Sequence, residues 1–421
     1  MTNARPAPTR AYAWLVLCFV SLAMFGNYYV YDCISPLADV LKAQLGFTDA
    51  NIGLLQAIYS MPNIVMVLIG GIIIDRVGTK KSTGLFAAVC LVGALITAST
   101  GQLAVMATGR LVFGLGAESL IVAVTTTIAR WFKGKELGFA FGLNLTLARF
   151  GSLAALNSPT WAAPAFATWQ RPLVIAIAFA IASFVGAVLY WLIEARAEAR
   201  FDLGRGETDK VVWKDIVRFG RSYWLVVGLC VTFYSAMFPF QTFAVKFFME
   251  AHGTSREMGG FLSSMLTLFA MIGTPLFGLL VDRVGRRSLF MMFGSALIVP
   301  VYLMMAYTHV SLYVPMAMMG IAFSLIPAVM WPSVTYVVDQ KRLGTAYGLM
   351  TMIQNIGLAG FNLLVGWAND YSAASADNPG GYALGMWIFS TLGFLGLLFA
   401  MLLRQREVGP HGQGLETIRA K

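Results

Sequence analysis

The segment GIIIDRVGTKK at residues 71–81 decides the fold, because a close copy returns as GLLVDRVGRR at residues 278–287, an offset of 207. The duplication extends further along the chain, since LGFAFGL at 137–143 returns as LGTAYGL at 343–349, an offset of 206. Similarity at a nearly fixed offset indicates a duplicated architecture. We therefore expect two related halves with the same order of structural elements.

The composition indicates a chain that uses hydrocarbon as its solvent. Of the 421 residues, 58% are hydrophobic and only 12% are charged, whereas a soluble protein is about one quarter charged. Apolar runs of about 20 residues are then read as membrane-spanning helices. We expect twelve of them, near residues 12–41, 51–74, 82–100, 103–129, 136–158, 172–194, 222–250, 257–281, 287–308, 312–338, 342–369 and 381–404.

The polar breaks between these runs predict four regions. Residues 1–194 form an N-terminal six-helix half, 195–221 a cytoplasmic linker, 222–404 a C-terminal six-helix half, and 405–421 a cytoplasmic tail. An even number of helices in each half means that both halves insert in the same orientation, related by an axis along the membrane normal. In such pairs, the expected binding site lies where the halves meet, near the bilayer midplane.

The positive charge predicts the orientation in the membrane. The net charge is +10, and most Lys and Arg residues lie in short segments between alternate apolar runs, as the positive-inside rule describes. We expect both termini in the cytoplasm and the lipid bilayer as the anionic partner, with no role for nucleic acid. The first apolar run is too long for a cleaved signal peptide and has no small-residue cleavage site.

The pattern Gly-x-x-x-Asp-Arg-x-Gly followed by basic residues, present in both halves, resembles the signature loop of the major facilitator superfamily. The resemblance implies the fold of that superfamily: an all-α membrane protein with twelve transmembrane helices in two six-helix halves. A carboxylate at a helix end can face a neighbouring helix end or an arginine. We therefore expect a gating role for Asp75, Arg76, Asp282 and Arg283, with topology and folding alone as the alternative.

Two charges deep in predicted spans are the first candidates for a substrate site, because such charges are costly in a bilayer. Glu118 and Arg149 lie on consecutive helices joined by a short cytoplasmic loop, each roughly 17–20 Å along its helix from that loop. They can pair in an empty site, or bind the ammonium and carboxylate of a zwitterion. The alternative is a structural ion pair between the two helices.

Other polar residues in the spans are weaker candidates. Arg110 stands two turns outward from Glu118 and either steers substrate or packs helices through hydrogen bonds to carbonyl groups. Asp32 and Tyr31, at the outer part of the first helix, are either a pocket wall or interfacial anchors. Further candidates for lining, each with simple packing as the alternative, are Tyr59, Trp331 and Asn355, the last at the place of Arg149 in the second half.

Several short segments of the N-terminal half go beyond features of the superfamily. They include YSMPN at 59–63, AESL at 117–120, WFKGKEL at 131–137 and ARFGS at 148–152, and they resemble the lysosomal dipeptide transporters of animals. The resemblance implies facilitated transport of dipeptides with broad side-chain tolerance. It also implies that an acid and an arginine, here Glu118 and Arg149, bind the two termini of the peptide.

The chain departs from that family in two ways. No acidic dileucine sorting signal precedes the first helix, and no Asn-x-Ser/Thr site lies in a predicted outer loop. We therefore expect residence in a bacterial inner (cytoplasmic) membrane, and a glycosylated accessory subunit is left open. A monomer is expected.

Three functions remain open at this point. The first is a dipeptide uniporter that works by alternating access. The second is a proton-coupled organic-anion carrier that uses Arg149, Arg110 and Lys246 for the anion and Glu118 for the proton. The third is a non-transporting sensor built on a transporter fold. Enzymatic chemistry, a cofactor and a metal are not expected, because no nucleophile–base set or metal-ligand cluster is evident in the sequence.

Overall fold

The computed structural model describes residues 9–132, 136–201, 216, 218–410 and 412–417, and in these ranges all regular elements are helices. The hydrocarbon core of a bilayer holds no water to bind backbone N–H and C=O groups. A helix satisfies these groups within its own segment, which is why apolar spans are helical. The shorter elements are η1 (Ser35–Leu37), α2 (Ala38–Leu45), α7 (Ser158–Trp161), η2 (Ala163–Ala167), η4 (Gln340–Arg342) and η5 (Pro379–Tyr382). The long helices are α1 (Arg10–Asp32), α3 (Asp49–Val77), α4 (Thr79–Ser99), α5 (Leu103–Trp131), α6 (Leu137–Leu156), α8 (Gln170–Arg200), α9 (Arg221–His252), α10 (Arg256–Val284), α11 (Arg287–Tyr307), α12 (Tyr313–Val337), α13 (Leu343–Tyr371) and α14 (Ala383–Val408).

The number of helices that can cross a membrane agrees with the sequence prediction. Within the described residues, eleven segments are long and apolar enough, or twelve when α3 counts as one bent span. The first of these segments runs on from α1 through η1 and α2 to Leu45. α3 contains Pro62 and bends by 56° between Asp49–Met66 and Ile69–Val77. The prediction of an all-α protein with multiple membrane spans is confirmed.

The chain forms two compact units. Unit 1 comprises the described residues within 1–34, 58–155 and 162–210, and unit 2 those within 35–57, 156–161 and 211–421. The connection after α1, with α2 and the first turns of α3, therefore belongs to unit 2. The units follow contacts in space, and the division of the sequence at the predicted boundaries stays a prediction.

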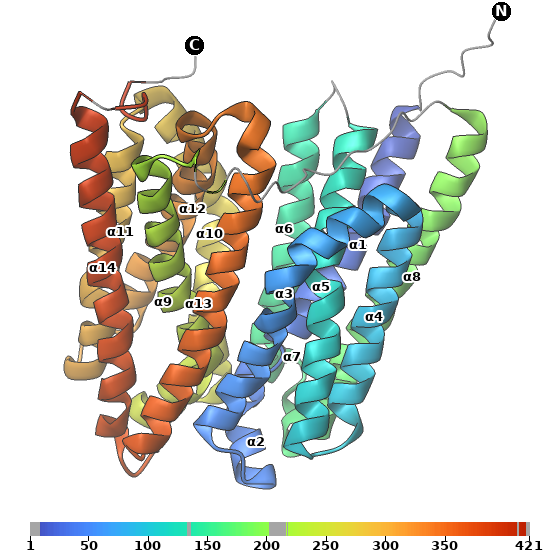
Figure 1. Cartoon of the computed structure of the whole chain (residues 1–421). Helices are drawn as coiled ribbons and strands as arrows, with labels where there is room; N and C mark the ends of the chain where they lie inside the picture. Colours follow the sequence, from blue (N-terminus) through green and yellow to red (C-terminus); the bar gives the residue numbers. More distant parts are fainter. Residues whose placement is uncertain (1–8, 133–135, 202–215, 217, 411, 418–421) are drawn as a thin grey trace, which may run out of the picture. The chain divides into compact units, whose positions relative to one another are not determined.

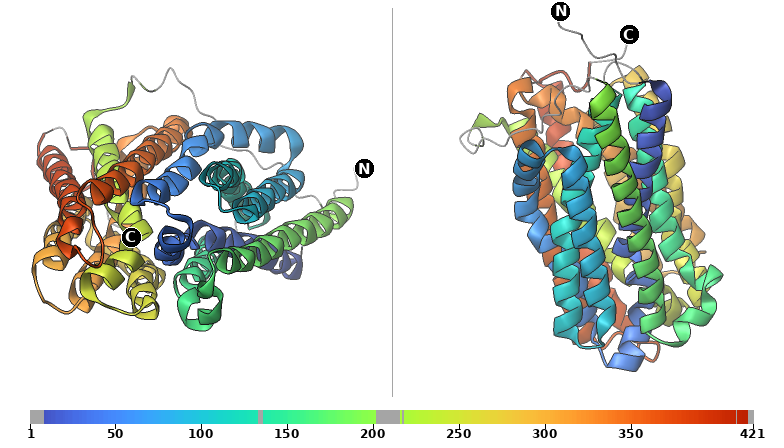
Figure 2. Two further views of the ribbon diagram at one scale, coloured as in Figure 1. Left: turned by 90° about the horizontal axis from the view of Figure 1, so that it is seen from below. Right: turned by 90° about the vertical axis from the view of Figure 1, so that its right-hand side faces the viewer.

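Close packing of α4 on α5 organises unit 1, where these helices run side by side (Figures 1 and 2). Small residues make the approach possible: a Cβ atom on Gly109 of α5 would lie 2.8 Å from the carbonyl oxygen of Gly93 on α4. Membrane helices associate through such small-residue contacts because lipid gives no hydrophobic drive between them. On the other side of the unit, Ser183 of α8 donates to the Ala23 carbonyl of α1 at 2.7 Å.

A buried carboxylate joins three helix ends in unit 1. Glu194 of α8 is fully buried and accepts hydrogen bonds from Arg130 at 2.6 Å, Trp131 at 3.1 Å and Thr79 at 2.9 Å. It also accepts one from Tyr190 on its own helix. The group fixes the start of α4 and the end of α5 to α8, next to the signature loop.

In unit 2, α9 is the central helix and packs on α10, α12, α13 and α14. Figure 1 shows α9 among these helices. Two buried tyrosines tie the helices to one another: Tyr302 of α11 donates to the Ala236 carbonyl at 2.7 Å, and Tyr223 donates to the Ala346 carbonyl of α13 at 2.8 Å. The hydroxyls are satisfied by backbone carbonyls within the bundle, as buried polar groups require.

The repeated signature segments form matching turns. Gly78 follows α3 with φ of 87°, and Gly285 follows α10 with φ of 72°. Their amides donate to the carbonyls of Ile74 at 2.9 Å and Val281 at 2.8 Å, one turn earlier in each helix. Only glycine adopts this backbone region at little cost, so the sequence repeat corresponds to a repeated helix end.

The segment 412–417 packs against the second of these turns. The amide of Arg286 donates to the Glu416 carbonyl at 3.2 Å, and the amide of Arg287 donates to the Leu415 carbonyl at 3.0 Å. Leu415 is fully buried. The first amides of a helix lack partners within it, and this segment supplies them for α11.

The packing of α4 on α5 predicts that Gly109→Val prevents correct assembly of unit 1, because valine cannot fit against the α4 backbone. Gly142→Val is the matched control, since a Cβ atom on Gly142 would meet nothing within 4 Å. Size-exclusion chromatography of the detergent-purified variants checks this. We expect loss of the monodisperse peak for Gly109→Val and a wild-type profile for Gly142→Val; a normal profile for both would contradict the packing.

Candidate functional site

A polar cluster in unit 1 is built from α1, α5 and α6. The Tyr28 side chain of α1 lies within electrostatic range of Arg149, Glu118 and Asp32. Glu118 and Arg149 are both partly buried. From the observed end of α5 and start of α6, each lies roughly 18–20 Å along its helix, near the middle of a ~30 Å hydrocarbon core. The equal depth expected from the sequence therefore holds in the folded helices.

Direct pairing of Glu118 and Arg149 in an empty site stays a prediction, and in this structure Tyr28 lies near both. Their assignment to substrate stays a prediction. An acid and a base thus lie at one depth on two consecutive long helices of unit 1.

Arg110 has a structural set of contacts. It is 1% exposed, and its guanidinium donates to the carbonyls of Val30 at 2.9 Å and Tyr31 at 3.2 Å. It also lies over the rings of Tyr59 at 5.4 Å and Phe113 at 5.3 Å, both within the range of a cation–π contact. Of the two alternatives, this geometry favours the helix-packing arginine, which holds the end of α1 against α5.

The remaining unit 1 candidates adjoin this arginine. Asp32 is buried and accepts a hydrogen bond from Ser152 of α6. The rings of Tyr31 and Tyr59 are 4.8 Å apart, and Tyr59 lies within electrostatic range of Glu118. The structure thus brings together six of the eight predicted substrate residues, Glu118, Arg149, Tyr59, Asp32, Tyr31 and Arg110, in one unit.

The other two candidates, Trp331 and Asn355, belong to unit 2. The indole of Trp331 donates to the Tyr234 hydroxyl at 2.9 Å and stacks on the ring of Tyr347 at 5.9 Å. The Asn355 amide donates to the Thr351 carbonyl of its own helix at 3.0 Å. These contacts are those of packed helix residues, and a substrate role for either stays a prediction.

The predicted gating residues lie at the ends of α3 and α10. Asp282 forms an ion pair with Arg287 at 2.7 Å, from the end of one helix to the start of the next. Asp75, Arg76 and Arg283 are exposed. The Asp282–Arg287 pair stabilises the turn itself, and gating by these residues stays a prediction.

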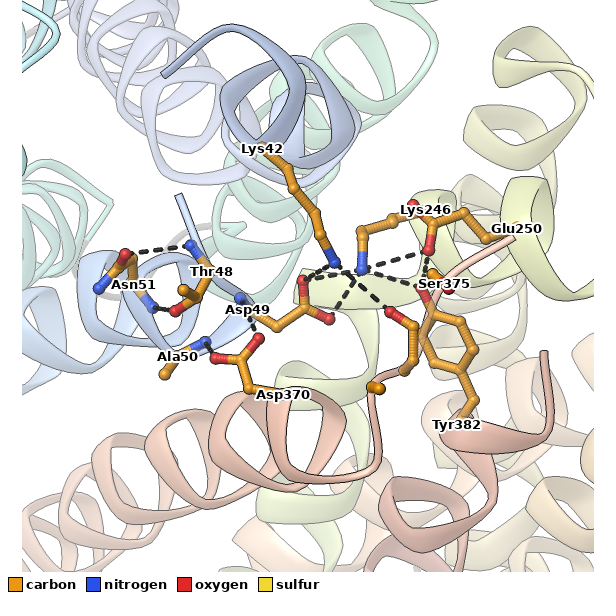
Figure 3. A network of polar contacts seen from close by, with 12 residues as sticks. Lys42, Thr48, Asp49, Ala50, Asn51, Lys246, Glu250, Asp370, Ser375 and Tyr382 are labelled. Carbon is orange, nitrogen blue, oxygen red and sulfur yellow. Dashed lines mark hydrogen bonds and ion pairs between the residues drawn. The ribbon is translucent and has the colours of Figure 1, made fainter. Parts of the chain in front are cut away.

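A charged network in unit 2 was missed by the sequence analysis (Figure 3). Lys246 of α9 is fully buried, and its ammonium donates to both carboxylate oxygens of Asp49, also fully buried, at 2.7 and 2.8 Å. It also donates to the Tyr382 hydroxyl at 2.9 Å and lies 3.4 Å from the Glu250 carboxylate. Lys246 is therefore committed to partners within the protein.

The same network fixes the start of α3. The Asp370 carboxylate of α13 accepts from the amides of Asp49 and Ala50 at 2.8 Å each (Figure 3), which is the favourable position for an anion at a helix N-terminus. Lys42 of α2 lies 3.6 Å from Asp49. Asp49 and Lys246 are 197 residues apart. Local sequence patterns do not report contacts between residues so far apart, so pairing them requires the three-dimensional fold.

The described part of the chain holds no group of three or more His, Cys, Asp or Glu side chains placed to bind a metal ion.

Comparisons with known proteins agree with this architecture. The family model described as Major Facilitator Superfamily matches residues 20–246 and 227–419. The lysosomal dipeptide transporter MFSD1 of Danio rerio is 35% identical over 369 residues, 84% of this chain and 79% of its own length. The human protein of that name is 34% identical over 378 residues, 86% of this chain and 81% of its own length.

A solved structure of the nucleoside transporter NupG covers 92% of this chain and 98% of its own length, with a TM-score of 0.72 at 14% identity, which shows the fold alone. With the signature turns, the membrane spans and these matches taken together, the chain belongs to the Major Facilitator Superfamily, as a multi-pass secondary transporter homologous to the lysosomal dipeptide transporters.

Proposed function

We propose that this protein carries dipeptides across the membrane by facilitated, alternating-access transport. The observation that carries the proposal is the placement of one acid, Glu118, and one base, Arg149, at the same depth on α5 and α6, both near Tyr28. The identity to transporters named for dipeptides supports the same substrate class.

The chemistry of a dipeptide fits this pair. Every free dipeptide carries an ammonium at one end and a carboxylate at the other, which Glu118 and Arg149 bind through charge-assisted hydrogen bonds. Neither contact involves the side chains of the substrate. Tyr31 and Tyr59 offer aromatic surface beside the cluster, so side chains of different size are accepted while the polar groups fix orientation.

The organic-anion alternative loses two of its three cations. Lys246 is held by Asp49, and Arg110 is held by the carbonyls at the end of α1. A carrier selective for dianions needs a surplus of positive charge at its site, and in unit 1 the acid Glu118 offsets Arg149. A zwitterion matches that balance better than an anion does.

The cellular setting belongs to the same proposal. The basic residues between alternate spans favour a cytoplasmic location for both termini, as expected for a protein of a bacterial inner membrane. We propose a monomer that works as a uniporter, in which the direction of net transport follows the dipeptide gradient.

Binding of the two peptide termini by Glu118 and Arg149 predicts that Glu118→Gln and Arg149→Ala each lower dipeptide uptake into proteoliposomes by tenfold or more. Each removes one charge-assisted contact, which contributes about 1.5–3 kcal/mol. The exposed residues Glu257 and Arg171 supply matched controls as Glu257→Gln and Arg171→Ala. Both control variants are expected to transport normally. Normal uptake by both Glu118→Gln and Arg149→Ala would refute the proposal.

The commitment of Lys246 to Asp49 predicts that Lys246→Met or Asp49→Asn alone lowers thermal stability strongly, because each leaves a buried charge without its main partner, at a cost of up to about 3–5 kcal/mol. The double variant Asp49→Asn/Lys246→Met leaves neither charge and is expected to regain much of the stability and to retain dipeptide uptake. Melting temperatures and flux assays of the three variants test this. A double variant that is stable but inactive would place Lys246 at the substrate.

A further inference from the structure

Asn63 on α3 is a buried polar side chain that the mechanism above does not use. It is 0% exposed, and neither its amide nitrogen nor its carbonyl oxygen has a hydrogen-bond partner. Buried polar groups are nearly always paired, and an unpaired one destabilises the protein. A carboxamide with both functions unsatisfied inside a transporter therefore points to a partner that the chain itself does not supply.

Its position follows from the way α3 lies on α5. Arg110, Gly114 and Glu118 are spaced four residues apart, so they share one face of α5. A Cβ atom on Gly114, the middle residue, would lie 2.8 Å from Pro62 of α3, and it would also meet the Tyr59 carbonyl. α3 therefore crosses this face at Gly114, between the arginine and the acid.

On either side of that crossing point, one turn of α3 lies toward Arg110 and the next lies toward Glu118. The Tyr59 ring lies on the Arg110 side, 5.4 Å from its guanidinium. Asn63 is one helical turn after Tyr59 and shares its face. α3 and α5 are the second and fourth spans, with α4 between them in the chain, so they run in the same direction. The turn that carries Asn63 therefore lies on the Glu118 side of Gly114.

The functional groups of Asn63 match one part of a dipeptide. A carboxamide offers an N–H donor and a C=O acceptor side by side, and a secondary amide offers one N–H and one C=O in the same way. In a dipeptide, this group lies between the two termini that Glu118 and Arg149 are proposed to bind. Free amino acids and dicarboxylates have no such group.

We propose that Asn63 binds the peptide bond of the substrate and is the residue by which the carrier distinguishes a dipeptide from other zwitterions. This inference rests on the dipeptide function proposed above and adds a third contact to it. α3 contains Pro62 beside Asn63 and bends by 56° just beyond it, so the part of α3 that carries Asn63 is next to a break where the helix changes direction.

The test compares two ligands that present the same termini. Glycylglycine has a peptide bond, and 5-aminopentanoate has the same number of chain atoms between its ammonium and carboxylate but no peptide bond. Affinities of both for the purified full-length protein are measured by isothermal titration calorimetry. The variants are Asn63→Leu, which is close in volume and apolar, and Ser119→Ala as a control, since Ser119 of α5 is equally buried and unpartnered but faces Gly70.

We expect wild type and Ser119→Ala to prefer glycylglycine by about tenfold or more, from hydrogen bonds at both ends of the amide. Asn63→Leu is expected to lose that preference, bind 5-aminopentanoate as wild type does, and melt no lower than wild type, because it removes an unsatisfied buried group. Retained preference in Asn63→Leu would overturn this inference alone. Failure of the wild type to bind either ligand would instead overturn the proposed function.

Discussion

A charge inside a bilayer needs an opposite charge or a full set of hydrogen bonds, and the organisation of this protein follows from that requirement. Lys246 meets it most completely, with Asp49, Tyr382 and Glu250 around its ammonium. Because Asp49 is also the first residue of α3, whose amides are bound by Asp370, the same contact fixes where that helix begins. The segment that joins α1 to α3 consequently packs with α9 and α13 as part of unit 2.

The same requirement explains the charges that hold helices together in unit 1. Glu194 collects Arg130, Trp131 and Thr79 at one end of unit 1, and Arg110 binds the last carbonyls of α1. Both are satisfied by the protein and hold helices together. Glu118 and Arg149 lie instead at mid-depth, near a shared tyrosine. We propose that this acid and base bind a ligand with two ends of opposite charge.

Local sequence was sufficient to predict the helices and their ends, but it was insufficient to predict which polar side chains contact one another. The repeated turns at Gly78 and Gly285 were predictable because glycine spacing and helix ends are local properties, and the twelve spans were predictable because hydropathy is local too. The gathering of Glu118 and Arg149 followed from helix depth. In contrast, the partner of Lys246 lies 197 residues away, and the choice between the two roles of Arg110 depended on where the end of α1 lies. Asn63 stood within a recognised segment, but its missing partners are visible only in three dimensions.

The central claim is that one acid and one base bind the two free termini of a dipeptide, and capping the termini tests it most directly. The measurement is the thermal stabilisation of the purified protein by a set of dipeptides, each compared with its N-acetylated and its C-amidated form and with dicarboxylates. Stabilisation by many free dipeptides that is lost when either terminus is capped is the predicted result. Stabilisation by dicarboxylates alone, or equally by capped and free dipeptides, would contradict the account.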